Sequence, residues 1–198
     1  KKDFISLKAK KEPFVFDEWV APRQATPLET TYLGKHIYLN SYYKGKEVSN
    51  LFTQEQRMKC SYRTQGNSPY DEWVNASKNN SFLRCFFGIC ENDIYERGGV
   101  NKQTLRRALK MHTYMASQFK AESAKALYDL FQSKSVLDFS AGWGDRLVGF
   151  LASNADSYIG IDPNTKLHEP YQQIVNLCDT GKEVRFICSP AENADLSD

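Results

Sequence analysis

The pattern of apolar and polar residues is clearest between residues 135 and 162. An apolar run ends at Asp138, and a short turn containing Gly142 and Gly144 follows it. Four apolar residues then recur at the spacing of one helix face. They are Leu147, Val148, Phe150 and Leu151. This pattern predicts a buried strand, a tight glycine turn and a helix that begins near Asp145.

A second strand is predicted from Ser157 to Ile161, and it ends at another acid, Asp162. The two acids, Asp138 and Asp162, are 24 positions apart in the sequence. That is about the separation between a phosphate-side turn and an acid that accepts hydrogen bonds from ribose hydroxyls. Because glycine allows close approach of a ligand and a helix start favours a carboxylate, we expect an α/β fold with a nucleoside-cofactor site.

Two common cofactor motifs do not fit this turn. The dinucleotide motif G-x-G-x-x-G/A needs a small residue at its last position, where this chain has Leu147. A phosphate-binding P-loop needs a lysine after its last glycine, and none follows Gly144. NAD, FAD and ATP are therefore disfavoured.

An acid after each of two strands, with a glycine turn between them, resembles the class I S-adenosylmethionine-dependent methyltransferases. The likeness is carried by the runs Asp138-Phe-Ser-Ala-Gly-Trp-Gly-Asp-Arg-Leu147, Gly160-Ile-Asp-Pro-Asn164 and Ser189-Pro-Ala-Glu192, with Leu167, His168 and Tyr171. More narrowly, these runs look like a group of phage, large-virus and microbial methyltransferases. That group resembles the DNA enzymes that methylate adenine N6 or cytosine N4.

The resemblance implies a Rossmann-like class I methyltransferase sheet, of which this chain holds the first three strands, the third from Glu183 to Cys188. It implies S-adenosylmethionine as the cofactor and places a set of residues at it. They are Asp138, Ser140, Ala141, Gly142, Gly144, Asp145, Asp162, Asn164, Ala191, Glu192 and, as a preceding aromatic, Phe119. Core packing is the competing interpretation for Phe119. The family's catalytic [DNS]-P-P-[YFW] turn is absent, so no catalytic residue is assigned.

The region before the turn is expected to be mainly helical after an irregular start. Residues 1–60 read as an extended arm with short strands near residues 14–16 and 32–39, and residues 51–98 as compact helices. Two more helices are predicted, one capped by Asn101 and running to about Gln118, the other from about Ala121 to Phe131. We expect an N-terminal extension over residues 1–100, a candidate nucleic-acid or partner contact, and a cofactor-binding half over residues 101–198.

Charge is divided unevenly along the chain, although the formal net charge is only +2. Residues 1–134 hold 22 Lys and Arg against 14 Asp and Glu, and residues 135–198 hold 4 against 10. The asymmetry favours a polyanion partner, while ordinary solvated surface charge would give the same counts. The resemblance to amino-methylating DNA enzymes implies DNA rather than RNA as that partner.

The sequence offers no paired metal-ligand spacing among its five cysteines and three histidines, so a metal is not expected and reduced, buried thiols are. No apolar stretch is long enough for a membrane span. These features favour an intracellular protein, cytoplasmic or nuclear, in the host cell if it is viral.

The first strand of this fold normally pairs with a fourth strand, which the chain does not supply before Asp198. We expect the edge of residues 136–139 to be covered by a longer parent polypeptide, a partner subunit or a swapped copy. Three functions stay open: a DNA base methyltransferase, a catalytically incomplete methyltransferase-like subunit with a structural or nucleic-acid-binding role, and a methyltransferase that acts on RNA or protein.

Overall fold

A computed structural model describes residues 2–8, 14–15, 28–32, 35–39, 45–61, 66–97 and 99–197. The chain divides into two compact units, one formed by residues 1–53 with 118–198 and the other by residues 54–117. In the described residues the fold is mixed α/β, with eight α-helices and a parallel three-stranded sheet. This confirms the predicted α/β class at that level.

The parallel sheet belongs to the first unit. It consists of β4 (Ser135–Asp138), β5 (Ser157–Ile161) and β6 (Glu183–Ile187), in the order β4-β5-β6. The register pairs Asp138 with Gly160, and Gly160 with Phe186. All three predicted strands are present, each within one residue of its expected bounds. Parallel strands end at the same edge of the sheet, so the loops after β4 and β5 lie together there.

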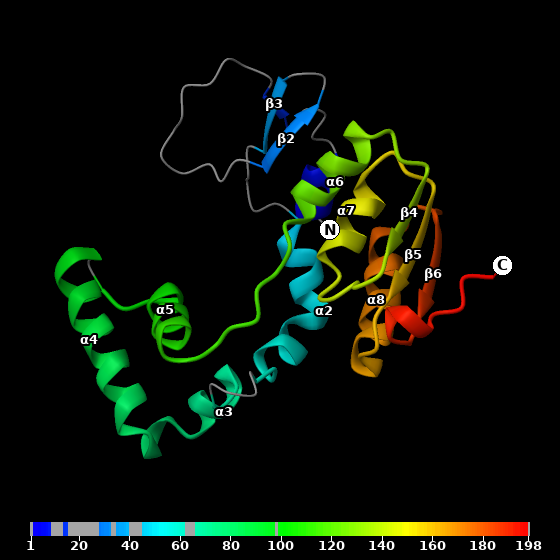
Figure 1. Ribbon diagram of the computed structural model, residues 1–198. Helices are drawn as coiled ribbons and strands as arrows, with labels where there is room; N and C mark the ends of the chain where they lie inside the picture. The colour runs from blue at the N-terminus through cyan, green and yellow to red at the C-terminus, as the bar shows by residue number, and fades with distance from the viewer. Residues whose placement is uncertain are drawn as a thin grey trace. The chain divides into compact units, whose positions relative to one another are not determined.

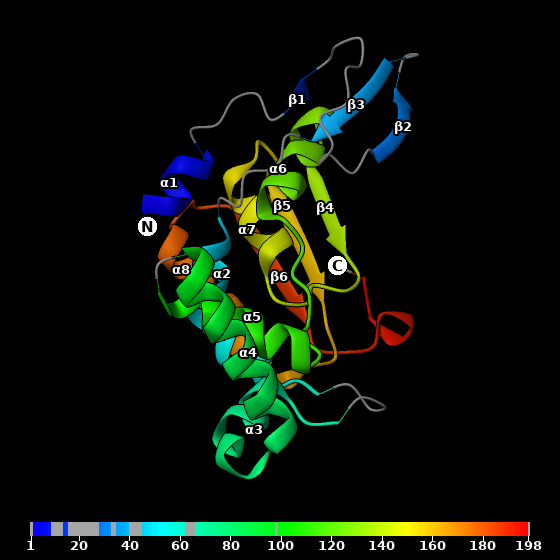
Figure 2. The ribbon, with the colours of Figure 1, turned by 90° about the vertical axis from the view of Figure 1, so that its left-hand side faces the viewer.

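Three helices lie on one face of this sheet (Figures 1 and 2): α6 (Ala121–Leu130), α7 (Asp145–Ala152) and α8 (Thr165–Cys178). The predicted start of α7 and the predicted span of α6 are confirmed. Their apolar stripes form the core with the inward-facing strand residues. Fully buried members of the core include Leu147, Val148, Phe150, Leu151, Tyr158, Tyr171 and Ile174.

The opposite face of the sheet is less covered. Leu137 is 52% exposed, and Phe139, just after β4, is 70% exposed. Among the described residues β4 pairs only with β5, so its outer edge offers unpaired backbone groups. Such an edge can pair with another strand.

Helices α6 and α7 approach each other closely at Gly149. A Cβ built on this glycine would lie 2.6 Å from the Ala121 carbonyl oxygen and 2.6 Å from the Ala124 Cβ. The absence of a side chain at position 149 therefore sets the distance between the two helices.

The irregular arm predicted for residues 1–60 is wrong in part, because two helices form there: α1 (Lys2–Lys8) and α2 (Lys46–Met58). Phe4 and Leu7 of α1 and Val48 of α2 are buried in the same core as α7. Tertiary packing thus supports helices that propensity alone does not reveal. The predicted strands appear as β1 (Phe14–Val15) and β3 (Lys35–Leu39), joined by β2 (Leu28–Tyr32) in an antiparallel sheet of order β1-β3-β2.

The second unit contains α3 (Pro69–Val74), the 3-10 helix η1 (Ala76–Lys78), α4 (Asn80–Arg97) and α5 (Lys102–His112). The Asn101 side chain accepts a hydrogen bond from the Thr104 N–H at 3.3 Å, which confirms the predicted cap. Helix α5 ends six residues before the predicted Gln118. Backbone groups after the helix bond to other parts of the unit instead: the Ala116 carbonyl accepts a hydrogen bond from Arg57 Nη1 at 3.4 Å.

The two units do not follow the predicted boundary near residue 100. The start of α2 belongs with α7, because the Ser49 hydroxyl donates to Asp145 at 2.6 Å. Helix α5 belongs with α4, because the Thr104 hydroxyl donates to the buried Asp93 at 2.6 Å.

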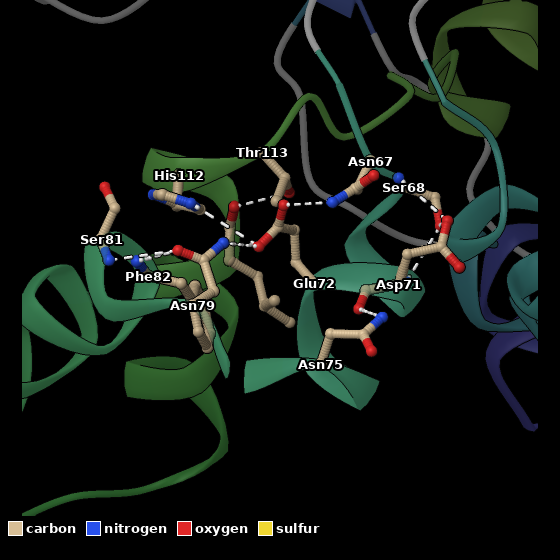
Figure 3. Close-up of polar contacts among 11 residues, drawn as sticks. Asn67, Ser68, Asp71, Glu72, Asn75, Asn79, Ser81, Phe82, His112 and Thr113 are labelled. Atoms are coloured by element: carbon tan, nitrogen blue, oxygen red, sulfur yellow. Dashed lines mark hydrogen bonds and ion pairs between the residues drawn. The ribbon is translucent and has the colours of Figure 1, made fainter. Parts of the chain in front are cut away.

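A buried carboxylate organises the second unit (Figure 3). Glu72 accepts from Asn67 Nδ2 at 3.0 Å and from the Asn79 amide, and His112 Nε2 lies 3.7 Å from the same carboxylate. The His112 ring also packs edge-on against Phe82, with ring centroids 5.5 Å apart. Glu72 therefore joins α3 to the segments that begin α4 and end α5.

The five cysteines are all free. Only Cys178 is buried, and Cys188 is exposed, so the expectation of buried thiols is wrong for most of them. None of the helices in the described part of the chain has the length and apolar composition that crossing a membrane requires.

Gly149→Ala should destabilise the first unit, because the new methyl group overlaps α6. Overpacking of this kind costs about 1–3 kcal/mol. The matched control is Gly88→Ala in α4, where a Cβ meets nothing within 4 Å and helix propensity should add roughly 0.5–1 kcal/mol. Urea unfolding monitored by circular dichroism measures both. Equal stability of Gly149→Ala and the parent chain would contradict this account of the α6–α7 contact.

Glu72→Ala should loosen the second unit, because the amides of Asn67 and Asn79 lose their acceptor. Asn67 is exposed and Asn79 half-buried, so water can replace the lost acceptor in part, and each lost bond costs about 0.5–1.5 kcal/mol. Hydrogen exchange should rise in residues 69–112 and stay unchanged in residues 121–178. Glu55→Ala, at an exposed surface pair with Lys59, is the control and should leave both regions unchanged. Unaltered exchange in Glu72→Ala would show that the cluster does not hold these helices.

Candidate functional site

The glycine turn is fixed to the end of the neighbouring strand by backbone hydrogen bonds. The Ala141 N–H donates to the Ile161 carbonyl at 2.9 Å, and the Gly142 N–H donates to Asp162 Oδ2 at 2.8 Å. Gly142 and Gly144 have φ values of +59° and +81°, which favour glycine. The two predicted sequence features, a turn after β4 and an acid after β5, are therefore in direct contact.

The two glycines have different surroundings. A Cβ on Gly144 would lie 2.9 Å from Ile174 Cδ1, so this glycine allows α8 to pack against the turn. A Cβ on Gly142 would have only Ser140 O at 3.6 Å and Arg146 Nη2 at 3.9 Å as neighbours. Gly142 is thus the point at which a ligand can approach the backbone.

Asp162 is nearly buried and oriented by two backbone groups. Besides Gly142 it accepts from the Asn164 N–H, at 2.9 Å to Oδ1. Each carboxylate oxygen keeps a further acceptor direction, which suits a pair of neighbouring hydroxyls. The Asn164 side chain itself caps α8 by accepting from the Lys166 N–H at 3.2 Å.

Helix α8 supports the turn from behind. The Tyr171 hydroxyl donates to the Gly142 carbonyl, and His168 Nε2 lies 2.8 Å from the Asp162 carbonyl oxygen. Burial raises the pKa of Tyr171 far above its ordinary value. The phenol therefore stays protonated as a donor across the physiological range.

Asp138 is 7% exposed and makes three internal contacts. It accepts from the Ser140 N–H at 3.2 Å, from the Tyr158 hydroxyl at 2.7 Å and from Arg146 Nε at 2.8 Å. Arg146 and Tyr158 were not among the residues predicted for the site. The position of Tyr158 in the strand could have indicated this contact, because the register of the two strands places Tyr158 diagonally across from Asp138.

The environment of Asp138 shifts the pKa of its neighbours. Burial, reinforced by the Asp138 charge, raises the pKa of Tyr158 well above its ordinary value and that of Tyr128 to about 12. Burial opposes the charge on Arg146, but the Asp138 carboxylate outweighs it and the pKa of Arg146 is raised. The Arg146 guanidinium therefore keeps its charge under physiological conditions.

The Asp145 carboxylate is bonded to α2. Its carboxylate accepts from the Ser49 hydroxyl at 2.6 Å and is 3.5 Å from Gln118 Nε2. The Thr53 hydroxyl donates to the Trp143 carbonyl at 3.1 Å, so two residues of α2 hold this side of the turn. The role that the structure gives Asp145 is to anchor α7 to α2.

The remaining predicted residues are divided between the turn and the surface. Phe119 is 44% exposed, and the Arg146 guanidinium carbon lies 5.3 Å from its ring centroid, so Phe119 lies beside Arg146. Ser140 is exposed and Ala141 is buried beside the turn. Ala191 and Glu192 lie in the exposed 3-10 helix η2 (Ala191–Asn193) after β6, with no described contact to the turn.

A cavity of about 590 Å³ lies in the second unit, and none of the predicted cofactor residues lines it. Its lining residues are Lys110, Met111, His112, Thr113, Tyr114 and Met115. No group of three or more metal-ligating side chains occurs among the described residues. No protein-family model, curated protein or solved structure matches the chain.

The raised pKa of Tyr128 predicts a loss of stability at alkaline pH. In the unfolded chain Tyr128 ionises near its ordinary value of 10.0, whereas the folded chain keeps the proton to about 12. The stabilisation is complete below pH 10 and is lost as pH rises to about 12. Tyr128→Phe should show a smaller fall in urea stability over this window than the parent chain, with pH 8 as the reference for each. An identical fall would contradict the assignment.

Proposed function

We propose that residues 119–198 bind S-adenosylmethionine and form the cofactor half of a class I methyltransferase with a Rossmann-like sheet. The observation that carries the proposal is the contact between Gly142 and Asp162 at the carboxyl edge of a parallel sheet. Ligands of open α/β sheets bind at this edge. The motif resemblance supplies the identity of the cofactor.

The residues present fit such a cofactor. Asp162 keeps acceptor directions for the ribose hydroxyls, and the open space at Gly142 admits the chain that links sugar to amino acid. The exposed face of Phe119 offers an apolar contact beside the turn. When bound, the cofactor supplies an activated methyl group. The protein's part is to orient it toward the acceptor.

For the acceptor we propose an exocyclic amine of a nucleic-acid base, with DNA favoured over RNA. The support is the resemblance to amino-methylating DNA enzymes and the excess of Lys and Arg in residues 1–134. A base in duplex DNA would have to leave the stack to reach the sheet edge. No catalytic residue is assigned to this chain.

A second candidate is a methyltransferase-like subunit without chemistry of its own. This candidate is favoured because two of the predicted cofactor-binding residues bond to other side chains of the protein. Asp138 pairs with Arg146, and Asp145 pairs with Ser49. In both cases we propose that the open edge of β4 and the exposed Leu137 and Phe139 are covered by another segment or chain.

Asp162→Asn should weaken binding of S-adenosylhomocysteine, measured by isothermal titration calorimetry. The variant keeps an acceptor for Gly142 but loses the charge. A charge-assisted bond is worth about 1.5–3 kcal/mol, or roughly ten- to a hundredfold in affinity. Gly142→Val should abolish binding by filling the approach to the turn.

The control for this experiment is Asp156→Asn, whose exposed carboxylate lies 3.7 Å from Lys134 on the surface. It should bind as the parent chain does. If Asp162→Asn and Gly142→Val both retain the parent affinity, the pocket is elsewhere. If the parent chain binds no S-adenosylhomocysteine at saturating concentration, the proposed cofactor is wrong.

A further inference from the structure

The Arg146 side chain is held in a fixed position beside the glycine turn. Its Nε donates to the nearly buried Asp138 at 2.8 Å, and its guanidinium lies over the Phe119 ring at 5.3 Å. An arginine restrained at one nitrogen and by ring stacking loses little further freedom when it binds a ligand. Arg146 is therefore a preorganised cation.

One terminal nitrogen of Arg146, Nη2, lies beside Gly142. Nη2 lies 3.9 Å from the position that a Cβ on Gly142 would occupy. Within the described residues, the hydrogen bond and ion pair of this side chain are made through Nε, to Asp138. The side chain is 28% exposed. The guanidinium thus presents donors at the point where a ligand reaches the backbone.

The surrounding charges select the kind of group that can bind. Asp138 pairs with Arg146 at its Nε side, and the start of α7 adds a partial positive charge. Asp162, on the other side of the turn, and Asp145, which faces α2, disfavour a multiply charged anion. A single planar carboxylate matches the arginine fork. The neighbouring Asp138 would tolerate an ammonium group next to that carboxylate.

We propose that Arg146 binds the carboxylate of the amino-acid end of the cofactor and makes the site selective for ligands that carry this end. The inference rests on the proposed function and adds a residue and a specificity to it. Arg146 is a binding residue in this proposal, and Asp138 and Phe119 are its positioning residues.

The test compares two ligands with the same nucleoside and sulfur, S-adenosylhomocysteine and 5′-methylthioadenosine, which lacks the amino-acid end. Arg146→Gln should lower the affinity for S-adenosylhomocysteine at least about tenfold, which is the loss expected when a charge-assisted hydrogen bond is removed. It should leave 5′-methylthioadenosine affinity unchanged. Arg146→Lys should recover part of the loss, because it restores the charge and not the fork. Arg185→Gln, on β6, is the control and should change neither affinity.

The outcomes separate this inference from the proposed function. A parent chain that binds neither ligand overturns the proposed function and this assignment with it. A parent chain that binds both, with S-adenosylhomocysteine affinity unchanged in Arg146→Gln, overturns the role of Arg146 alone. Because removing Arg146 leaves Asp138 buried without a cation, the glutamine variant can fail to fold. If the glutamine variant also loses 5′-methylthioadenosine binding, it has failed to fold. Arg146→Lys then provides the test: if its affinity falls equally for both ligands, the proposal is contradicted.

Discussion

The hydrogen bond from the Gly142 N–H to Asp162 is the constraint on which the site depends, because it joins two loops that the sequence separates by 20 positions. A carboxylate that accepts backbone N–H groups is fixed in both position and orientation. The same bond defines the curvature of the turn, since Gly142 must keep a positive φ while its carbonyl accepts from Tyr171. The strand order, the turn and helix α8 are thus mutually dependent.

Two buried carboxylates beside the glycine turn, Asp138 and Asp145, stabilise the fold and also border the proposed site. Asp138 and Asp145 are each less than a tenth exposed, and an unpaired carboxylate at such positions would be costly. Arg146 and Tyr158 satisfy the first, and Ser49 satisfies the second. These bonds convert a loop into a rigid edge, which is what a cofactor site needs. They also mean that loss of a ligand residue and loss of local structure are coupled here.

Much of the sheet unit could be predicted from the sequence, because its signals are local. Alternating or continuous apolar runs define β4, β5 and β6, and a helical stripe after paired glycines defines α7. Helix α1 and the first turn of α2 do not follow from the sequence, because packing of Phe4, Leu7 and Val48 in the core of α7 supports them and the sequence does not show that contact. The position of Arg146 was likewise hidden, since it depends on which way Asp138 and Phe119 face. Asp145, which the resemblance places at the cofactor, accepts a hydrogen bond from Ser49, which lies 96 positions away in the sequence.

The exposed side of the sheet and the site are physically connected. Parallel strands are normally buried on both faces, yet Leu137 and Phe139 stay open while β4 lacks an outer neighbour among the described residues. Phe139 directly follows the strand that leads into the glycine turn, so anything that covers this face also borders the turn. A segment or chain that pairs with β4 would therefore stabilise the sheet and, at the same carboxyl edge, border the glycine turn.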